Sequence, residues 1–257
     1  MALAARQLIP DSQLKHGELS SVAVPVISEM VGRIPRGRVI LAMYDSDSQY
    51  NPLFVNISAE HLRSGGDLLY IASSRPLNEI REQFSELGLD IAEYEARDNA
   101  VLFDAYSTAM GIKSSEKYQT RSSNLNELSI TISESALQWP AGTLVINELY
   151  SEMALNQENV FAKFLKRVVG RWRNRGAIMI VGLATDLHSP QFYQQMKLVS
   201  DGVLEIKLTE HGGEIINVIR ARSMKGQNSD TRWRQILFDS KMKASLRLLQ
   251  QHEEAED

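Results

Sequence analysis

The polar residues at positions 45–54 are the first candidates for chemistry, because they separate an apolar, strand-like run from a helical pattern. In an open parallel sheet, ligands bind beyond the carboxyl ends of the strands. A phosphate-binding loop here needs glycines, whose backbone N–H groups approach phosphates, and a Lys followed by Ser or Thr. Between Tyr44 and Ala59 the sequence has neither Gly nor Lys, and Asp45 and Asp47 add negative charge. This stretch therefore argues against binding of nucleotide phosphates in the usual mode.

The other residue types that often do chemistry form no recognisable site. The five His are scattered without metal-ligand spacing, and each is predicted to lie on the surface or in a loop. The chain has no Cys, which excludes thiolate metal sites and Cys nucleophiles, and it has no GxSxG nucleophile motif. We therefore expect neither a metal ion nor a cofactor.

Five short apolar runs predict strands buried on both faces, because they are nearly continuous rather than alternating. Helical patterns precede the first run or lie between and after the others, and strands that alternate with helices predict an α/β fold with right-handed crossovers. The predicted strands are residues 38–44, 67–73, 100–106, 143–149 and 177–183. The predicted helices are residues 22–30, 52–63, 76–88, 125–136, 160–172 and a last one that begins at residues 189–190.

The pattern changes after Asp201. Residues 202–208 and 214–221 flank a turn at His211, Gly212 and Gly213, which predicts a β-hairpin, and residues 232–238 predict a further strand. The fold is thus a mostly parallel sheet extended by an antiparallel hairpin. We expect a mobile arm over residues 1–20, one domain over residues 21–240, and a helix that leads into an acidic tail over residues 241–257.

Composition is that of an ordinary globular protein, with 43% hydrophobic and 23% charged residues and a net charge of −4. The acidic balance argues weakly against a general nucleic-acid binder. No apolar run approaches the 18 or so residues of a membrane span, and the N-terminal residues do not follow the pattern of a signal peptide. A cytoplasmic location is the expectation.

Several segments between residues 22 and 239 are informative when taken in order. They are GRIPRG with RVILAMY, SGGDLLYIAS, IREQFSELGLD, VLFDAY, LVINEL, RWRNRGAIMIVG, VSDGVLEIKL and IRARSMKG. Together they resemble the RecA-fold ATPases of the KaiC-like group, which include archaeal KaiC-like proteins and the archaellum accessory ATPase, and the resemblance implies a RecA-like fold.

Carried onto this sequence, the family's catalytic positions are all replaced. The glycine, lysine and Ser/Thr of its phosphate loop fall on Gln49, Tyr50 and Asn51; its glutamate pair falls on Ser73 and Ser74; and its Walker B aspartate falls on Asn147. Together these losses remove charge stabilisation and water activation. Glu148 follows Asn147, but strand alternation predicts that it points to the opposite face, as an ordinary polar residue at a strand end.

Arg220 and Arg222 resemble the family's Lys-x-Arg pair, which in ring-forming relatives reaches the nucleotide of a neighbouring subunit. One hypothesis is that these arginines pair with Asp45 and Asp47 across such a boundary. The alternative is a solvated basic strand edge, which also discourages aggregation.

A second basic feature lies on the predicted helix 160–172 and just after it. Nucleic-acid binding is one interpretation, but cations in a last helical turn also favour the helix dipole. If this face adjoined the basic spot Arg232-Trp233-Arg234, nucleic-acid binding would gain support. The cations are Lys163, Lys166, Arg167, Arg171, Arg173 and Arg175.

These observations favour a non-catalytic KaiC-like protein, a regulatory or scaffolding subunit that assembles with itself or with an active RecA-fold paralogue. One alternative is a nucleotide-binding protein or ATPase with an altered phosphate loop, in which Asn51, Ser46 and Ser48 bind a sugar or base. A third is a recombinase-like DNA-binding protein. Enzyme activity is not the favoured interpretation.

Overall fold

The computed structural model describes residues 21–120, 125–135, 140, 142–148 and 158–249. Its main sheet has the strand order β11-β10-β9-β8-β3-β7-β6-β4-β5. The strands from β8 to β5 are parallel, and β9, β10 and β11 extend the sheet in antiparallel fashion. The bounds are β3 (Val39–Tyr44), β4 (Leu68–Ala72), β5 (Ala100–Asp104), β6 (Leu144–Asn147), β7 (Ile178–Ala184), β8 (Gly202–His211), β9 (Glu214–Met224), β10 (Arg234–Phe238) and β11 (Ala244–Leu248).

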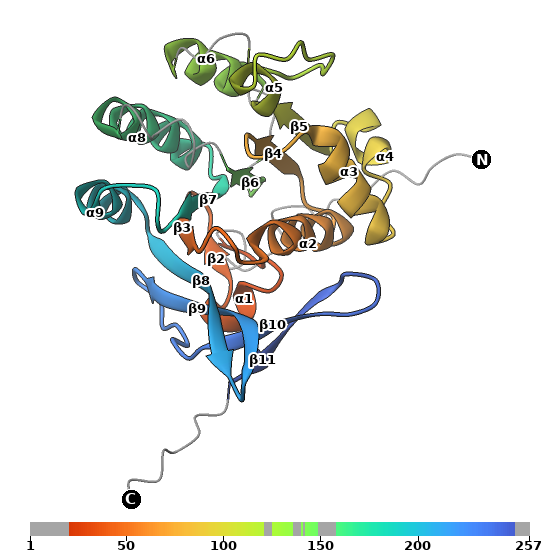
Figure 1. The fold of residues 1–257 in the computed structure, drawn as a ribbon. Helices are drawn as coiled ribbons and strands as arrows, with labels where there is room; N and C mark the ends of the chain where they lie inside the picture. The colour runs from red at the N-terminus through yellow and green to blue at the C-terminus, as the bar shows by residue number, and fades with distance from the viewer. Residues whose placement is uncertain (1–20, 121–124, 136–139, 141, 149–157, 250–257) are drawn as a thin grey trace, which may run out of the picture.

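Helices cover both faces of the parallel part of the sheet (Figure 1). One face carries α2 (Tyr50–Arg63), α3 (Leu77–Glu86) and α4 (Ile91–Ala96), and the other carries α6 (Leu125–Ser135), α8 (Glu158–Asn174) and α9 (Pro190–Val199). The short α5 (Tyr106–Ala109) follows β5. Among the described residues, no helix combines the length and the apolar character that crossing a membrane requires.

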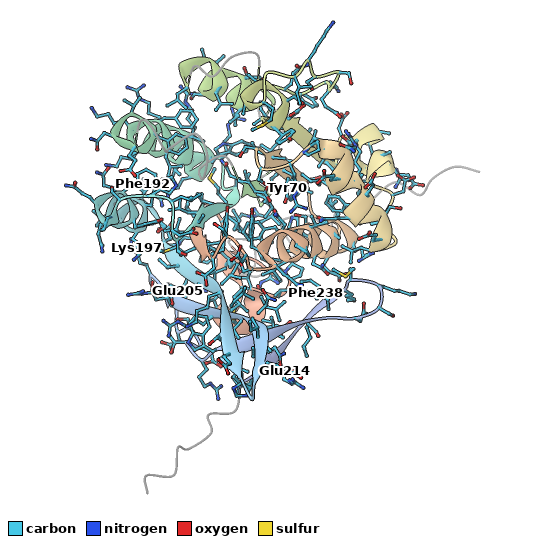
Figure 2. The ribbon with its side chains drawn as sticks, viewed as in Figure 1. Tyr70, Phe192, Lys197, Glu205, Glu214 and Phe238 are labelled. Carbon is cyan, nitrogen blue, oxygen red and sulfur yellow. The ribbon has the colours of Figure 1, made fainter. Side chains whose placement is uncertain are left out.

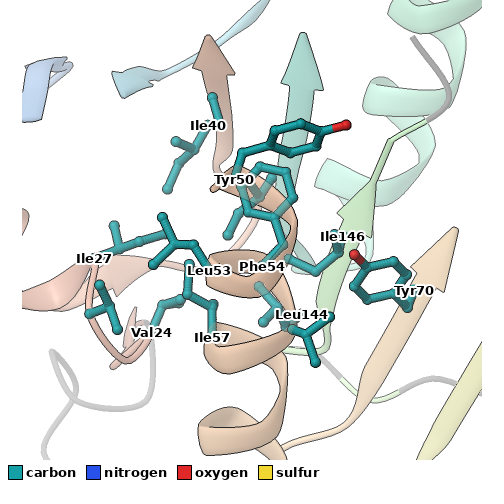
Figure 3. Packing of buried hydrophobic residues seen from close by; sticks show 14 of the residues in the cluster. Val24, Ile27, Ile40, Tyr50, Leu53, Phe54, Ile57, Tyr70, Leu144 and Ile146 are labelled. Atoms are coloured by element: carbon teal, nitrogen blue, oxygen red, sulfur yellow. The ribbon is translucent and has the colours of Figure 1, made fainter. Parts of the chain in front are cut away.

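Each parallel strand contributes to two hydrophobic cores, which explains the continuous apolar runs. Ile40 and Ala42 of β3 belong to the core under α2, whereas Leu41 belongs to the core under α8. Figure 3 shows Leu53 and Phe54 of α2 among the side chains of the first core. The five predicted strands and the mostly parallel sheet with its antiparallel extension are confirmed, with strand ends within one or two residues of the predicted ones.

The predicted helix over residues 22–30 is wrong for most of its length. Val22 belongs to β1 (Ser21–Val22), which pairs with β2 (Ile34–Pro35), and helix α1 spans only Ser28–Val31. Between β1 and α1, Val26 has a positive φ of 66°, a conformation that interrupts a right-handed helix.

The predicted helix at 241–257 is also contradicted, because residues 244–248 form β11. The Asp239 carboxylate accepts hydrogen bonds from the N–H groups of Lys241 and Lys243, and Met242 has a positive φ of 57°, so the chain turns back there. Ala244 and Leu246 then pack against the core under α2. The predicted arm at 1–20 and the acidic tail lie outside the described residues.

Candidate functional site

The loop after β3 is tied to both neighbouring strands by one carboxylate. Asp45 Oδ1 accepts a hydrogen bond of 2.9 Å from the hydroxyl of Thr185, just after β7, and its Oδ2 accepts one of 3.3 Å from the N–H of Leu208 in β8. The Asp45 side chain therefore has a structural role, because it links the loop to β8 and to the end of β7. Asp47, two residues further along, is exposed.

The backbone N–H groups of this loop, which a phosphate loop directs at its anion, are bonded within the protein. The N–H of Asp45 donates to the Ile206 carbonyl at 3.0 Å, and the N–H of Ser48 donates to the Asp45 carbonyl at 2.9 Å. The N–H of Gln49 donates to Asn217 Oδ1 at 2.8 Å. These three donors cannot turn to a phosphate without breaking existing hydrogen bonds.

The next residue, Tyr50, begins α2 and is only 9% exposed. Its ring stacks on that of Tyr44 with centroids 3.6 Å apart and an interplanar angle of 13°, and it meets Phe54 edge-on at 5.8 Å. Gly182 of β7 leaves room for this cluster, since a Cβ there would lie 3.0 Å from Phe54 and 3.2 Å from Tyr44. The position that the resemblance assigns to the phosphate-binding lysine is thus part of an aromatic cluster.

Glu148, just beyond β6, lies at the centre of a buried polar network on the α2 side of the sheet. The Tyr70 hydroxyl donates to Glu148 Oε1 at 2.5 Å, and the Ser74 hydroxyl donates to Oε2 at 3.0 Å. The Ser73 hydroxyl donates to the Glu148 main-chain carbonyl at 2.9 Å. Glu148 is 1% exposed.

Asn51 joins this network from the first turn of α2. In the amide orientation that satisfies both ends of its side chain, it donates to Glu148 Oε1 at 3.1 Å and accepts from the Tyr50 hydroxyl and from Arg75. Burial raises the pKa of Glu148, although the hydrogen bonds from Tyr70 and Ser74 and the charge of Arg75 oppose the shift. Burial, reinforced by the charge of Glu148, raises the pKa of Tyr70 well above its usual value.

The expectation that Glu148 is an ordinary polar residue at a strand end is therefore wrong. The predicted alternation holds, because Glu148 lies on the opposite face from Asn147, and that face is the one with α2. Tyr70 lies opposite Ile146 in the parallel register, so Glu148 comes two residues later on the same face. The signal in the sequence was a Tyr within an aliphatic strand, since a buried phenol needs a hydrogen-bond partner.

The model of the protein family described as "ATPase: KaiC" matches residues 22–239. The chain belongs to this KaiC family. Among solved structures, a KaiC-like protein from the hyperthermophilic archaeon Pyrococcus horikoshii OT3 matches with a TM-score of 0.67 over 87% of this chain and 96% of that chain. The two sequences are 13% identical, so the likeness concerns the RecA-like fold. No curated protein sequence matches the chain significantly.

In this KaiC-family chain, Arg220 and Arg222 both pair with Glu205 of the same chain, each at 2.6 Å. Burial opposes ionisation of Glu205, yet the two arginines hold its pKa below the usual value. Both arginines lie on β9, which pairs with β8 along this stretch and with β10 at Val218 and Ile219. Their pairing with Asp45 and Asp47 of a neighbour stays a prediction.

The predicted basic cations all lie on α8 or just after it, and its Lys163, Lys166 and Arg167 are exposed. Arg173 pairs with Asp201 at 2.6 Å, and Arg171 donates to the hydroxyl of Ser129. Trp172 is 3% exposed and has no surface for base stacking. Figure 1 shows α8 far from β10, so this face does not adjoin the basic spot around Trp233.

One His differs from the sequence expectation: His61 lies within α2 and is 2% exposed, with its ring against Gly66. His188 lies in the loop before α9, as expected, and packs its ring on Phe192 with centroids 4.8 Å apart. Both rings fill space within the fold. Among the described residues, no group of three His, Cys, Asp or Glu could hold a metal ion.

Proposed function

We propose that this chain is a KaiC-family protein without ATPase activity, which acts as a regulatory or scaffolding subunit by assembling with itself or with an active RecA-fold paralogue. The observation that carries the proposal is the burial of Tyr50 in the Tyr44–Tyr50–Phe54 stack. A lysine in this position would have to extend toward phosphates, whereas the tyrosine ring packs back onto β3.

Electrostatics supports the first half of the proposal. Phosphoryl transfer depends on cations that balance the charge of the phosphates and on a group that activates water. The corresponding positions hold Tyr50, Asn51, Ser73 and Ser74, which are uncharged. The nearby carboxylate, Glu148, already accepts hydrogen bonds at both oxygens and is sealed from solvent.

The second half of the proposal is supported by the contrast between this site and the rest of the fold. The main sheet, its helices and both cores are present, although the positions that the resemblance assigns to nucleotide binding hold Gln49, Tyr50 and Asn51. A fold that is kept around an inactive site is typical of a subunit that acts by binding other subunits at its surface. The inference rests on analogy at the level of the fold.

Thermal unfolding with and without millimolar MgATP, at matched ionic strength, tests the loss of nucleotide binding. A ligand at one hundred times its dissociation constant would add about 2.7 kcal/mol of apparent stability. We expect no shift in Tm and no phosphate release. A clear shift that disappears in Asn51→Ala would overturn the proposal in favour of nucleotide binding by an altered loop.

Light scattering across a hundredfold range of concentration tests assembly. We expect a mass above that of one chain, which falls in Asp47→Lys if this exposed carboxylate meets Arg222 of a neighbour. Glu93→Lys, an exposed carboxylate on α4, is the matched control. A single-chain mass at every concentration, with no complex formed with a RecA-fold paralogue, would contradict the assembly half of the proposal alone.

A further inference from the structure

The extension of the sheet has one face that no described helix covers. In the view of Figure 1, α9 lies near the start of β8, and the β8–β9 hairpin extends downward, away from α9. The antiparallel register aligns one row of side chains across four strands: Lys207 in β8, Val218 in β9, Gln235 in β10 and Arg247 in β11. Figure 2 shows Glu205, two residues before Lys207, on the α9 side and Phe238 on the side of α2.

Trp233 is the aromatic centre of this face. Lys207 Nζ lies 4.6 Å from the centroid of its ring, and the guanidinium carbon of Arg220 lies 4.4 Å from it. The ring is half-buried, and Val218 in the same row is fully buried. Two cations are thus held beside a single aromatic ring at the surface.

The face has more positive than negative charge, in a chain whose net charge is −4. Glu205 pairs with Arg220 and Arg222. Among the ion pairs between described residues, none involves Lys207 or Arg247. Next to Arg247 is an open hollow of about 320 Å³, lined by His211, Gln235, Arg247, Leu248 and Leu249.

We infer that this basic face, defined by Lys207, Arg220, Trp233 and Arg247, is a docking site for an acidic extended segment, and that the occupant is the chain's own acidic segment at positions 253–257. Four of these five residues are acidic: Glu253, Glu254, Glu256 and Asp257.

The route of the chain places this acidic segment within reach of the cations. The N–H of Leu249 donates to the Trp233 carbonyl at 3.1 Å, so the chain leaves β11 directly beside the residue that holds Lys207 and Arg220. Glu253 follows four residues later, a distance of at most about 14 Å when extended. The strands lie about 4.8 Å apart, so β9 and β8 are about 10 and 14 Å from β11.

Tethering makes weak ionic contacts effective. A segment joined by a few residues is present at millimolar effective concentration, so even a modest charge attraction can keep it bound. Since the contacts are between surface charges, salt should weaken them. The Debye length, beyond which charges are largely screened, is about 10 Å at 0.1 M salt.

The test uses the full chain and a full-length neutralised variant with Glu253→Gln, Glu254→Gln, Glu256→Gln and Asp257→Asn. The Trp233 indole N–H resonance, assigned with Trp233→Phe, should differ between the two proteins at 50 mM salt and coincide at 0.5 M. A labelled peptide of residues 250–257 should bind the neutralised variant, and bind the unmodified chain about tenfold more weakly because its own segment competes.

Charge reversal identifies the surface. In the neutralised background, Lys207→Glu with Arg247→Glu should abolish peptide binding, whereas Lys163→Glu with Lys166→Glu on α8 changes the net charge equally and should leave it intact. Circular dichroism melts establish that each variant is folded, and Lys207→Met serves if Lys207→Glu is not. Equal peptide binding by the unmodified and neutralised chains, or equal loss in the α8 control, would overturn the inference. An indole difference that grows with protein concentration would show that the segment of a second copy, rather than the chain's own, occupies the face.

Discussion

Polar side chains have different partners at the carboxyl edge of the parallel sheet and on the open face of β8–β11. At the edge, Asp45, Asn51 and Glu148 direct their side chains at partners inside the protein, and Tyr50 packs its ring between Tyr44 and Phe54. On the open face, Lys207 lies beside Trp233 and Arg247 is exposed, and neither forms an ion pair with another described residue. Within this KaiC-family fold, the polar side chains at the carboxyl edge are thus bonded inside the protein, whereas those of the open face lie on an exposed sheet.

The largest effect is expected from Tyr50→Ala. The substitution leaves a cavity between Tyr44 and Phe54, and removal of a large buried aromatic side chain costs about 3–5 kcal/mol. Denaturant unfolding gives the change in the free energy of unfolding. Tyr50→Phe keeps the ring and should cost less than about 1.5 kcal/mol. If Tyr50→Ala itself cost less than about 1.5 kcal/mol, the stack would be dispensable and the edge less closed than the contacts indicate.

Glu148→Gln tests the same edge through pH. Because burial raises the pKa of Glu148, the folded state retains its proton to higher pH than the unfolded state. The stability of the unmodified chain should therefore fall relative to Glu148→Gln as the pH rises above about 4.5, by at most about 1.4 kcal/mol per pH unit for one proton. Urea titrations at pH 4.5 to 8 measure the difference, and one that does not change with pH would contradict a buried, proton-holding carboxyl.

On the open face, Trp233→Ala should have a smaller effect. The half-buried ring holds Lys207 and Arg220, so its loss should cost about 2 kcal/mol from lost apolar burial and two cation–π contacts. Thermal and denaturant melts measure this cost. Trp233→Phe, which retains a ring, is the control and should recover about half of it. A cost equal to that of Tyr50→Ala would erase the difference between the two regions.

The smallest effect is expected from Arg222→Gln. Its side chain is 53% exposed, and Glu205 keeps its other partner, Arg220, so the change should stay below about 0.5 kcal/mol and shrink further with salt. Arg220→Gln should cost more, because Arg220 also lies over Trp233. Parallel urea titrations at 0.05 and 0.5 M salt compare the two. The reverse order would mean that the exposed pair matters more than the stacked one.

Local patterns predicted most of the parallel core. The apolar runs around Ile40, Tyr70 and Ile180 were recognisable as strands because burial on both faces removes polar residues from a strand. The prediction failed at residues 244–248, where a helix was expected although Ala244, Leu246 and Leu248 alternate as in a strand. The turn that makes these residues a strand depends on Asp239 and on the Asn56 side chain, which bonds the Met242 carbonyl and the Ala244 N–H from a distant helix.

The resemblance assigned Gln49, Tyr50 and Asn51 to the loop and Ser73, Ser74 and Asn147 beside it, and their interpretation as replaced catalytic positions stays a prediction. It did not reveal that Ser73, Ser74 and Asn51 all bond to Glu148, because that network joins residues almost a hundred positions apart through the parallel pairing of β4 with β6.

By itself, the sequence determined the alternation of strands and helices and the absence of Gly and Lys from the loop after β3, since both follow from residue types within a few positions of one another. The tertiary structure decided which face Glu148 occupies, which acceptors take the loop N–H groups, and which cations surround Trp233. Those outcomes depend on the register between distant strands, where a shift of one residue would turn every side chain to the other face.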